Sequence, residues 1–177
     1  SLPLDYQRPV TQTFNGTVYR HTLSAELTSA LSELSRSSQT TMFMTLQAAF
    51  AVLLSRYSQE QDIVMGTPIA NRDHEAIAPL IGFFVNTLAL RTDLSSEPSF
   101  VELLAQTKQM ALSAFEYQQL PFEMLVDKLQ LDRNLAYNPL FQLMFVYTAK
   151  QASNELKLES LEQELFIKHH SIAKFDL

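Results

Sequence analysis

The sequence contains no cysteine, and this absence removes several classes of site at once. Without a thiol the chain forms no disulfide, offers no thiolate ligand to a metal ion and has no cysteine nucleophile. Glycine is also scarce, with three residues at positions 16, 66 and 82 that are far apart in the sequence. A phosphate-binding loop needs glycines close together, so the sequence contains no loop of this kind.

Long runs of one charge and long apolar runs are missing as well. The 13 basic and 19 acidic residues give a net charge of −6, and no run of lysine or arginine suggests nucleic acid as a partner. No apolar stretch approaches the roughly 18 residues that a membrane-spanning helix needs. The first ten residues lack the basic start and the apolar core of a signal peptide. We therefore expect a cytoplasmic protein that binds neither nucleic acid nor a membrane.

The residues that are present are typical of a soluble globular protein, with 46% apolar and 18% charged residues. A chain of 177 residues is long enough to form one domain with a sizeable core.

Helices are indicated where apolar residues recur every three or four positions. Ser24 is a good N-cap for a helix that carries Leu27, Leu31 and Leu34 on one side. Ser99 and Glu102 form a capping box that opens a helix to about residue 115. We expect a further helix from about residue 41 to 55 and a short one that Pro121 begins. The helix over residues 41–55 is predicted to bury one apolar side, made of Leu46, Ala49, Phe50, Leu53 and Leu54.

Strands are indicated by alternating or continuous apolar residues between these helices. The predicted strands are Phe14–Leu23, Asp62–Ile69, Ile81–Leu90, Leu140–Thr148 and two closing strands within residues 155–175. Because helices and strands are interleaved, we predict an α/β fold, a layered sandwich of a mixed β-sheet with helices packed on it.

The block from Pro79 to Arg91, PLIGFFVNTLALR, places two polar side chains in an otherwise apolar strand pattern. Asn86 and Thr87 are those residues. A buried amide needs hydrogen-bond partners, because an unmatched one costs about 1–3 kcal/mol. Asn86 is therefore expected either to brace a neighbouring loop or to face a polar cavity.

Four sequence blocks, in this order along the chain, resemble the condensation domains of non-ribosomal peptide synthetases. They are Gly66–Arg72 (GTPIANR), Pro79–Arg91, Tyr117–Glu123 (YQQLPFE) and Asp132–Phe145 (DRNLAYNPLFQLMF). The opening residues Leu2–Pro9 and the closing residues Ala173–Leu177 fit the same family. The resemblance covers essentially the whole chain.

Members of this family resemble two chloramphenicol-acetyltransferase-like lobes side by side, with a catalytic His-His-x-x-x-Asp-Gly motif at the end of the first lobe. This motif is absent from residues 1–177, so we expect the chain to be the C-terminal lobe as a single domain, without catalytic residues. The resemblance implies a peptide-bond-forming acyltransferase. Its substrates would be thioesters on the phosphopantetheine arms of carrier proteins, and it would have no covalently bound cofactor. The implied partners are the N-terminal lobe, the peptidyl carrier domains and the adenylation domain.

His169-His170 is the one feature that suggests a catalytic pair. In the family motif an aspartate lies four residues after the second histidine and a glycine follows, whereas Lys174 and Phe175 stand at these positions. Asp176 lies two residues further on, which adds about 6–7 Å on a strand. We therefore interpret the pair as structural. Neither a Gly-x-Ser-x-Gly motif nor a metal-ligand spacing of histidines and carboxylates is found.

By resemblance, a substrate tunnel between the lobes is expected to be lined by Gly66, Thr67, Asn71, Asn86, Thr87 and Gln142. From the residues alone, Gly66 marks either a close approach by a backbone or ligand or simply the end of a strand at a turn. Gln142 would equally suit a core hydrogen bond to the backbone. Two positions depart from the family pattern, because Tyr117 replaces a histidine and Gln119 an aspartate.

Two alternatives from other functional classes remain. A condensation-like lobe without catalytic residues could recruit a carrier or another partner protein. A small free-standing acyltransferase would instead need His170 as its base and would assemble into an oligomer.

Overall fold

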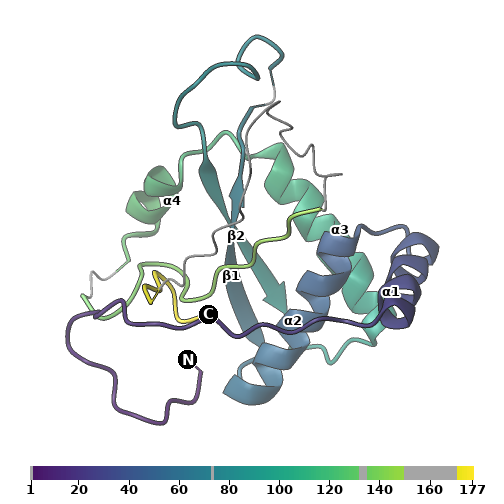
Figure 1. The fold of residues 1–177 in the computed structure, drawn as a ribbon, viewed down its shortest axis with the longest axis horizontal. Coiled ribbons are helices and arrows are strands. Elements are labelled where there is room, and N and C mark those ends of the chain that lie inside the picture. Colours follow the sequence, from purple (N-terminus) through teal and green to yellow (C-terminus); the bar gives the residue numbers. More distant parts are fainter. Residues whose placement is uncertain (1, 73, 132–134, 150–170) are drawn as a thin grey trace, which may run out of the picture.

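The computed structural model describes residues 2–72, 74–131, 135–149 and 171–177 (Figure 1). In chain order its elements are α1 (Ala25–Ser37), α2 (Met42–Ser58), β1 (Asp62–Ile69), β2 (Asn86–Asp93), α3 (Phe100–Glu116) and α4 (Phe122–Leu129).

The two strands form an antiparallel pair whose register runs from Asp62 opposite Asp93 to Ile69 opposite Asn86. Alternate residues along each strand are buried, namely Ile63, Met65 and Thr67 on β1 and Leu88, Leu90 and Thr92 on β2. Helix α2 packs on β1 and α3 packs on β2, and the two helices also contact each other, while α1 packs on α2 (Figure 1). The structure therefore confirms the predicted α/β fold in which helices pack on a sheet.

The helix starts follow the predicted caps closely. The Ser24 hydroxyl accepts a hydrogen bond from the Leu27 backbone N–H at 3.2 Å, and Ser99 and Glu102 form the complete capping box. Hydrogen bonds from the Ser99 hydroxyl and backbone N–H hold the pKa of Glu102 below its usual value. Pro121 is the N-cap of α4 rather than its first residue. No helix in the described parts of the chain is long and apolar enough to cross a membrane.

The buried side of α2 differs from the predicted one. Ala49 and Leu53 are exposed, Leu46 and Phe50 are half-buried, and of the predicted set only Leu54 is fully buried. The buried residues are Met44, Thr45, Gln47, Ala48, Ala51 and Leu54. Polar residues can lie on this buried face because they form hydrogen bonds inside the protein. The Gln47 amide, for example, donates to the Thr92 hydroxyl at 3.0 Å. Apolar periodicity alone therefore placed the face incorrectly.

The predicted strand over Ile81–Leu90 is wrong in its first half, because β2 begins only at Asn86. The β1 strand ends at Ile69, opposite Asn86, so residues 81–85 have no strand to pair with. Their connection projects beyond the helices at the top of Figure 1, and Ile81 and Phe83 are almost fully exposed. Alternation of large side chains in this segment therefore reflects a loop and not a strand.

Two other predicted strands are reduced to single bridges. Within Phe14–Leu23, Asn15 pairs with Ile172, and within Leu140–Thr148, Met144 pairs in parallel with Gly66. The backbone N–H and carbonyl of Gly66 bond the carbonyl of Leu143 and the N–H of Phe145, each at 2.8 Å. This segment thus lies along the free side of β1 without forming a regular strand. Apart from residues 171–175, the two predicted closing strands lie outside the described residues.

The opening and closing segments are tied together by Arg8. Its guanidinium bonds both carboxylate oxygens of Asp176 and lies over the Tyr137 ring, 4.5 Å from the ring centroid. The hydrogen bonds with Asp176 raise the pKa of Arg8. Because Asp176 and Tyr137 belong to two different segments, one side chain joins three parts of the chain that are distant in sequence.

Gly66 lies under an aromatic cluster. A Cβ atom at this position would overlap the ring of Phe141, which is buried and packs between the rings of Phe122 and Phe175 at centroid distances of 5.4 and 5.8 Å. The backbone angle φ of Gly66 is not positive, so its role is close approach and not an unusual backbone conformation. Of the two readings of Gly66, the structure supports close approach, here by an aromatic ring.

We predict that Gly66→Ala lowers the free energy of unfolding by about 1–3 kcal/mol, because the flanking rings keep Phe141 from moving aside. Chemical denaturation of the wild type, Gly66→Ala, Phe141→Leu and the double variant measures this. The smaller Leu side chain should make Gly66→Ala less costly in the double variant. Additive losses would show that Phe141 is not the obstacle.

Candidate functional site

A pocket of about 280 Å³ lies where β1 ends and β2 begins. We name it the Asn86 pocket. It is lined by Asn71, Phe83, Val85, Asn86, Thr87, Gln119, Pro121, Phe122 and Glu123. These residues come from the strand ends, from the β1–β2 loop and from the junction of α3 and α4. The pocket therefore lies where three of the four family-like sequence blocks meet.

Two polar lining residues come from the strand ends. Asn71 follows β1 by two residues and has a φ of 50°, a left-handed conformation that asparagine adopts more readily than most residues. Thr87, the second residue of β2, is half-buried. Both side chains can form hydrogen bonds with a ligand in the pocket.

Asn86 is held by three hydrogen bonds to the backbone of the α3–α4 junction. Its Nδ2 donates to the carbonyl oxygens of Gln118 and Leu120, both at 2.8 Å. Its Oδ1 accepts from the backbone N–H of Phe122 at 3.1 Å. The amide thus satisfies two carbonyls in the junction that follows α3 and the N–H of the first residue of α4. Of the two roles left open by the sequence, the hydrogen bonds support bracing of a loop, while the same residue also borders the pocket.

The pocket brings together three of the six sequence-predicted residues, Asn71, Asn86 and Thr87. Gly66 and Thr67 do not line it, because Gly66 lies under Phe141 and Thr67 is 3% exposed. A smaller cavity of about 100 Å³ next to the pocket shares Thr87 and Phe122 with it and extends to Phe141.

Gln142 also lies away from the Asn86 pocket. Its Oε1 accepts from the Asn138 N–H at 3.0 Å, and its Nε2 donates to the Asn138 carbonyl at 2.8 Å. This pair of bonds closes the turn that holds Asn138 and Pro139. The geometry thus corresponds to the hydrogen bond to backbone that the sequence allowed, and a role in a tunnel wall is untested.

Sequence reasoning missed six residues that line the pocket, namely Phe83, Val85, Gln119, Pro121, Phe122 and Glu123. Phe83 and Val85 were placed on the same face of a strand that does not form. The other four lie in the YQQLPFE block, so the family resemblance could have pointed to them. Nothing near them in the sequence indicates that they lie close to Asn86.

The lining of the pocket is almost neutral. Glu123 is its single ionisable residue, and its side chain is exposed. A general base or a nucleophile with an activating partner is not found among these lining residues, so they can bind and orient a ligand but offer no obvious proton acceptor other than this carboxylate. The pocket has the chemistry of a binding surface rather than of a catalytic centre.

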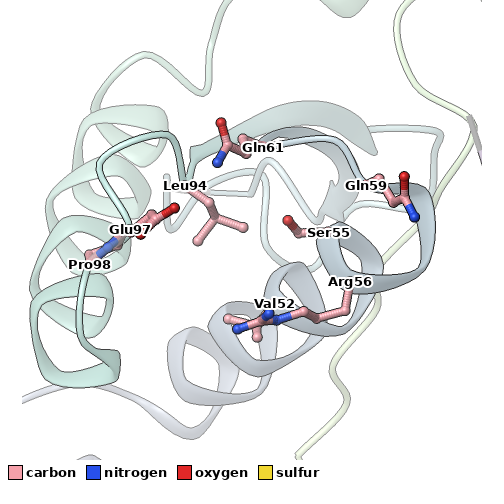
Figure 2. A pocket seen from close by; sticks show the side chains of 8 residues that line it. All are labelled: Val52, Ser55, Arg56, Gln59, Gln61, Leu94, Glu97 and Pro98. Carbon is pink, nitrogen blue, oxygen red and sulfur yellow. The ribbon is translucent and has the colours of Figure 1, made fainter.

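A larger hollow of about 590 Å³ lies between the end of α2 and the β2–α3 loop (Figure 2). It is bordered by polar side chains such as Arg56, Gln59 and Glu97 and contains none of the sequence-predicted residues. The Asn86 pocket, which brings together three of those residues, is therefore the stronger candidate site.

Comparison with known families identifies the class of the protein. The condensation domain family matches residues 1–177, and the chain belongs to this family.

Particular relatives are peptide synthetases. The chain is 48% identical over 181 aligned positions to one of the linear gramicidin synthase proteins of Brevibacillus parabrevis, an alignment covering 100% of the chain and 3% of that protein. It is 44% identical over 182 positions to one of the plipastatin synthase proteins of Bacillus subtilis, covering 99% of the chain and 7% of that protein. The chain thus spans only a few per cent of the length of these relatives.

Solved structures show the same fold. A four-domain nonribosomal peptide synthetase aligns with a TM-score of 0.82 at 28% identity, over 84% of this chain and 11% of that one. The X-domain from teicoplanin biosynthesis aligns with a TM-score of 0.75 at 33% identity, over 81% of this chain and 32% of that one.

We predict that Asn86→Ala lowers the free energy of unfolding by about 1–3 kcal/mol, because two carbonyls and one N–H lose their partner. Asn86→Asp should cost at least as much, since its carboxylate cannot donate to the carbonyls of Gln118 and Leu120. Thr87→Ala, a neighbouring change in the pocket lining, should have a smaller effect. Thermal and denaturant unfolding measure all three, and an Asn86→Ala variant as stable as wild type would rule out the bracing role.

Proposed function

We propose that the chain is the C-terminal lobe of a condensation domain that forms peptide bonds in a non-ribosomal peptide synthetase. The observation that carries this proposal is the full-length family match of a chain that lacks the His-His-x-x-x-Asp-Gly motif. The catalytic histidine would lie in an N-terminal lobe outside residues 1–177. His169 and His170 lie outside the described residues, and we assign them no catalytic role.

In the proposed reaction the amine of a downstream aminoacyl thioester attacks the carbonyl of an upstream aminoacyl or peptidyl thioester. A C–N bond forms, the upstream C–S bond breaks, the amine gives up a proton and the upstream phosphopantetheine arm leaves as a thiol. The peptide is then one residue longer and is bound to the downstream carrier. The arms act as substrates, and we propose no resident cofactor.

The Asn86 pocket would form part of one wall of the substrate tunnel. Its amides and hydroxyl can hydrogen-bond a thioester or amide group without holding a charge in place. Its apolar residues, among them Phe83 and Phe122, can contact an amino-acid side chain. This neutral, partly apolar lining fits the binding of an uncharged acyl group.

The proposed partners are the N-terminal lobe, the peptidyl carrier domains and the adenylation domain of one synthetase in the cytoplasm. Support comes from the multidomain peptide synthetases to which the chain is similar. The exposed apolar side chains of the β1–β2 loop would contact the N-terminal lobe, since large exposed apolar patches usually mark an interaction surface.

A second candidate function is recruitment of another protein without peptide-bond formation. It is favoured by one comparison, because a solved structure similar to this chain is the X-domain of teicoplanin biosynthesis in a complex with OxyB. That alignment has a TM-score of 0.74 at 33% identity. A recruiting module would bind its partner without needing a catalytic histidine in either lobe.

We predict that the chain alone forms no dipeptidyl thioester from two loaded carrier proteins, whereas the complete two-lobe domain does. Mass spectrometry of the downstream carrier measures the product. Turnover by the isolated chain would contradict the assignment of catalysis to the other lobe. A complete domain that is inactive with its own loaded carriers but binds a partner protein would favour the recruiting module.

We also predict that the chain alone self-associates through Leu80, Ile81, Phe83 and Val85, whose exposed fractions lie between 49% and 103%. The sequence suggests Ile81–Leu90 and Phe141–Tyr147 as the apolar surface, but Leu88, Leu90 and Phe141 are buried and do not contribute to it. Sedimentation of the wild type and an Ile81→Ser, Phe83→Ser double variant tests it. Co-expression with the N-terminal lobe should disperse the assemblies. A monomeric wild type at high concentration would count against an apolar interface here.

A further inference from the structure

Arg72 is the side chain around which the β1–β2 loop is built. Its Nη1 donates to the carbonyl oxygens of Ile77, Ala78 and Leu80 at 2.8, 3.2 and 2.7 Å. Its Nη2 lies 3.3 Å from the carbonyl oxygen of Gly82. One guanidinium therefore gathers four carbonyl groups from a loop that has no strand partner.

The guanidinium plane also has an aromatic contact. The Phe84 ring lies under it at 4.3 Å from the ring centroid, a distance at which a cation and an aromatic face attract each other. Only arginine combines a planar cation with several N–H donors in fixed directions, so lysine cannot reproduce this arrangement. The contacts begin at Ile77 and end at Phe84, so they span most of the connection between Arg72 and β2.

Among the described residues, the loop contributes little to the packed core. Apart from half-buried Ile77 and Phe84, residues 74–84 are exposed, and the apolar core clusters contain none of them. Short turns link His74 to Ile77 and Ala78, and Ile77 to Leu80, but these bonds stay within the loop. The path of residues 80–84 relative to the sheet consequently depends on Arg72.

This path determines one wall of the Asn86 pocket. Phe83 and Val85 line the pocket, as does Asn71, which precedes Arg72. Gln119 and Pro121, which also line the pocket, belong to the junction that Asn86 braces. Two of the segments that line the pocket are thus each held by one polar side chain. Arg72 holds the β1–β2 loop, and Asn86 holds the α3–α4 junction.

We propose that Arg72 is a positioning residue for the condensation reaction, which fixes the Phe83–Val85 wall and thereby sets the affinity for a carrier-bound substrate. The inference rests on the proposed function. Arg72 touches no reacting atom and acts through the loop. Its loss should therefore weaken substrate binding while leaving the chemical step and the helical core nearly unchanged.

The test uses the complete condensation domain with the two carrier domains that flank it, each loaded with its cognate amino acid. For Arg72→Ala we expect KM for one of the two loaded carriers to rise about tenfold or more, with kcat changed less than about threefold. Arg72→Lys should resemble Arg72→Ala, because an ammonium cannot both reach the carbonyls and stack on Phe84. Arg36→Ala, which removes an exposed guanidinium on α1 that pairs with Glu33, is the matched control and should behave as wild type.

Cleavage by chymotrypsin after Phe83 or Phe84 gives a readout that is independent of turnover. We expect Arg72→Ala and Arg72→Lys to be cut at least several-fold faster than the wild type and Arg36→Ala. Phe84→Leu removes only the stacking contact and should raise KM by a smaller factor.

Wild-type values of KM for both carriers in Arg72→Ala would overturn the proposal. So would losses of activity in Arg72→Ala and Phe84→Leu that equal the unfolded fraction of each protein. If the wild-type domain forms no dipeptide, the proposed function itself fails. The chymotrypsin measurement then still decides whether Arg72 holds the loop.

Discussion

The constraint on which this fold depends is the need to satisfy backbone groups beyond the point where the two-stranded pairing stops. The pairing of β1 with β2 stops at Ile69 and Asn86, where β1 ends and β2 begins. The loops around that point have no strand to bond. Water can satisfy the N–H and C=O groups of an exposed loop, but it does not fix the path of the loop. Hydrogen bonds from protein side chains can do both. Two side chains do this, Asn86 for the α3–α4 junction and Arg72 for the β1–β2 loop.

The same constraint explains why a pocket forms at this end of the hairpin. Arg72 and Asn86 each fix a segment that contributes lining residues to the Asn86 pocket. The packed part of the chain lies elsewhere. Met65 of β1 packs with Ala51 and Leu54 of α2, while Leu103 and Leu104 of α3 pack with Ala48 of α2. The packed core and the Asn86 pocket thus lie at different positions along the two strands. Under the proposed function, such a nearly neutral wall would help a C-terminal lobe to orient acyl groups, with the catalytic histidine supplied by the N-terminal lobe.

The sequence predicts those features whose causes are local. Ser24 and the Ser99–Glu102 pair act within three residues, so their caps are readable directly. The partners of Asn86 lie 32 to 36 residues away, and only the structure shows which backbone it braces. Alternation failed at Ile81–Val85, because period-two spacing does not show whether a neighbouring strand exists. Helical periodicity of apolar residues failed on α2, because polar Gln47 is buried there and bonds Thr92. That bond cannot be read from a helical pattern.

The most direct test of the central claim, that the Asn86 pocket belongs to the substrate path, is a crystal structure of the complete condensation domain. It should be determined with an aminoacyl pantetheine in which an amide replaces the thioester. We expect the acyl group or the pantetheine arm to contact Asn71, Thr87 or Phe83, with Asn86 still bonded to Gln118, Leu120 and Phe122. A ligand bound elsewhere between the lobes, with the pocket filled by side chains of the N-terminal lobe, would contradict the account.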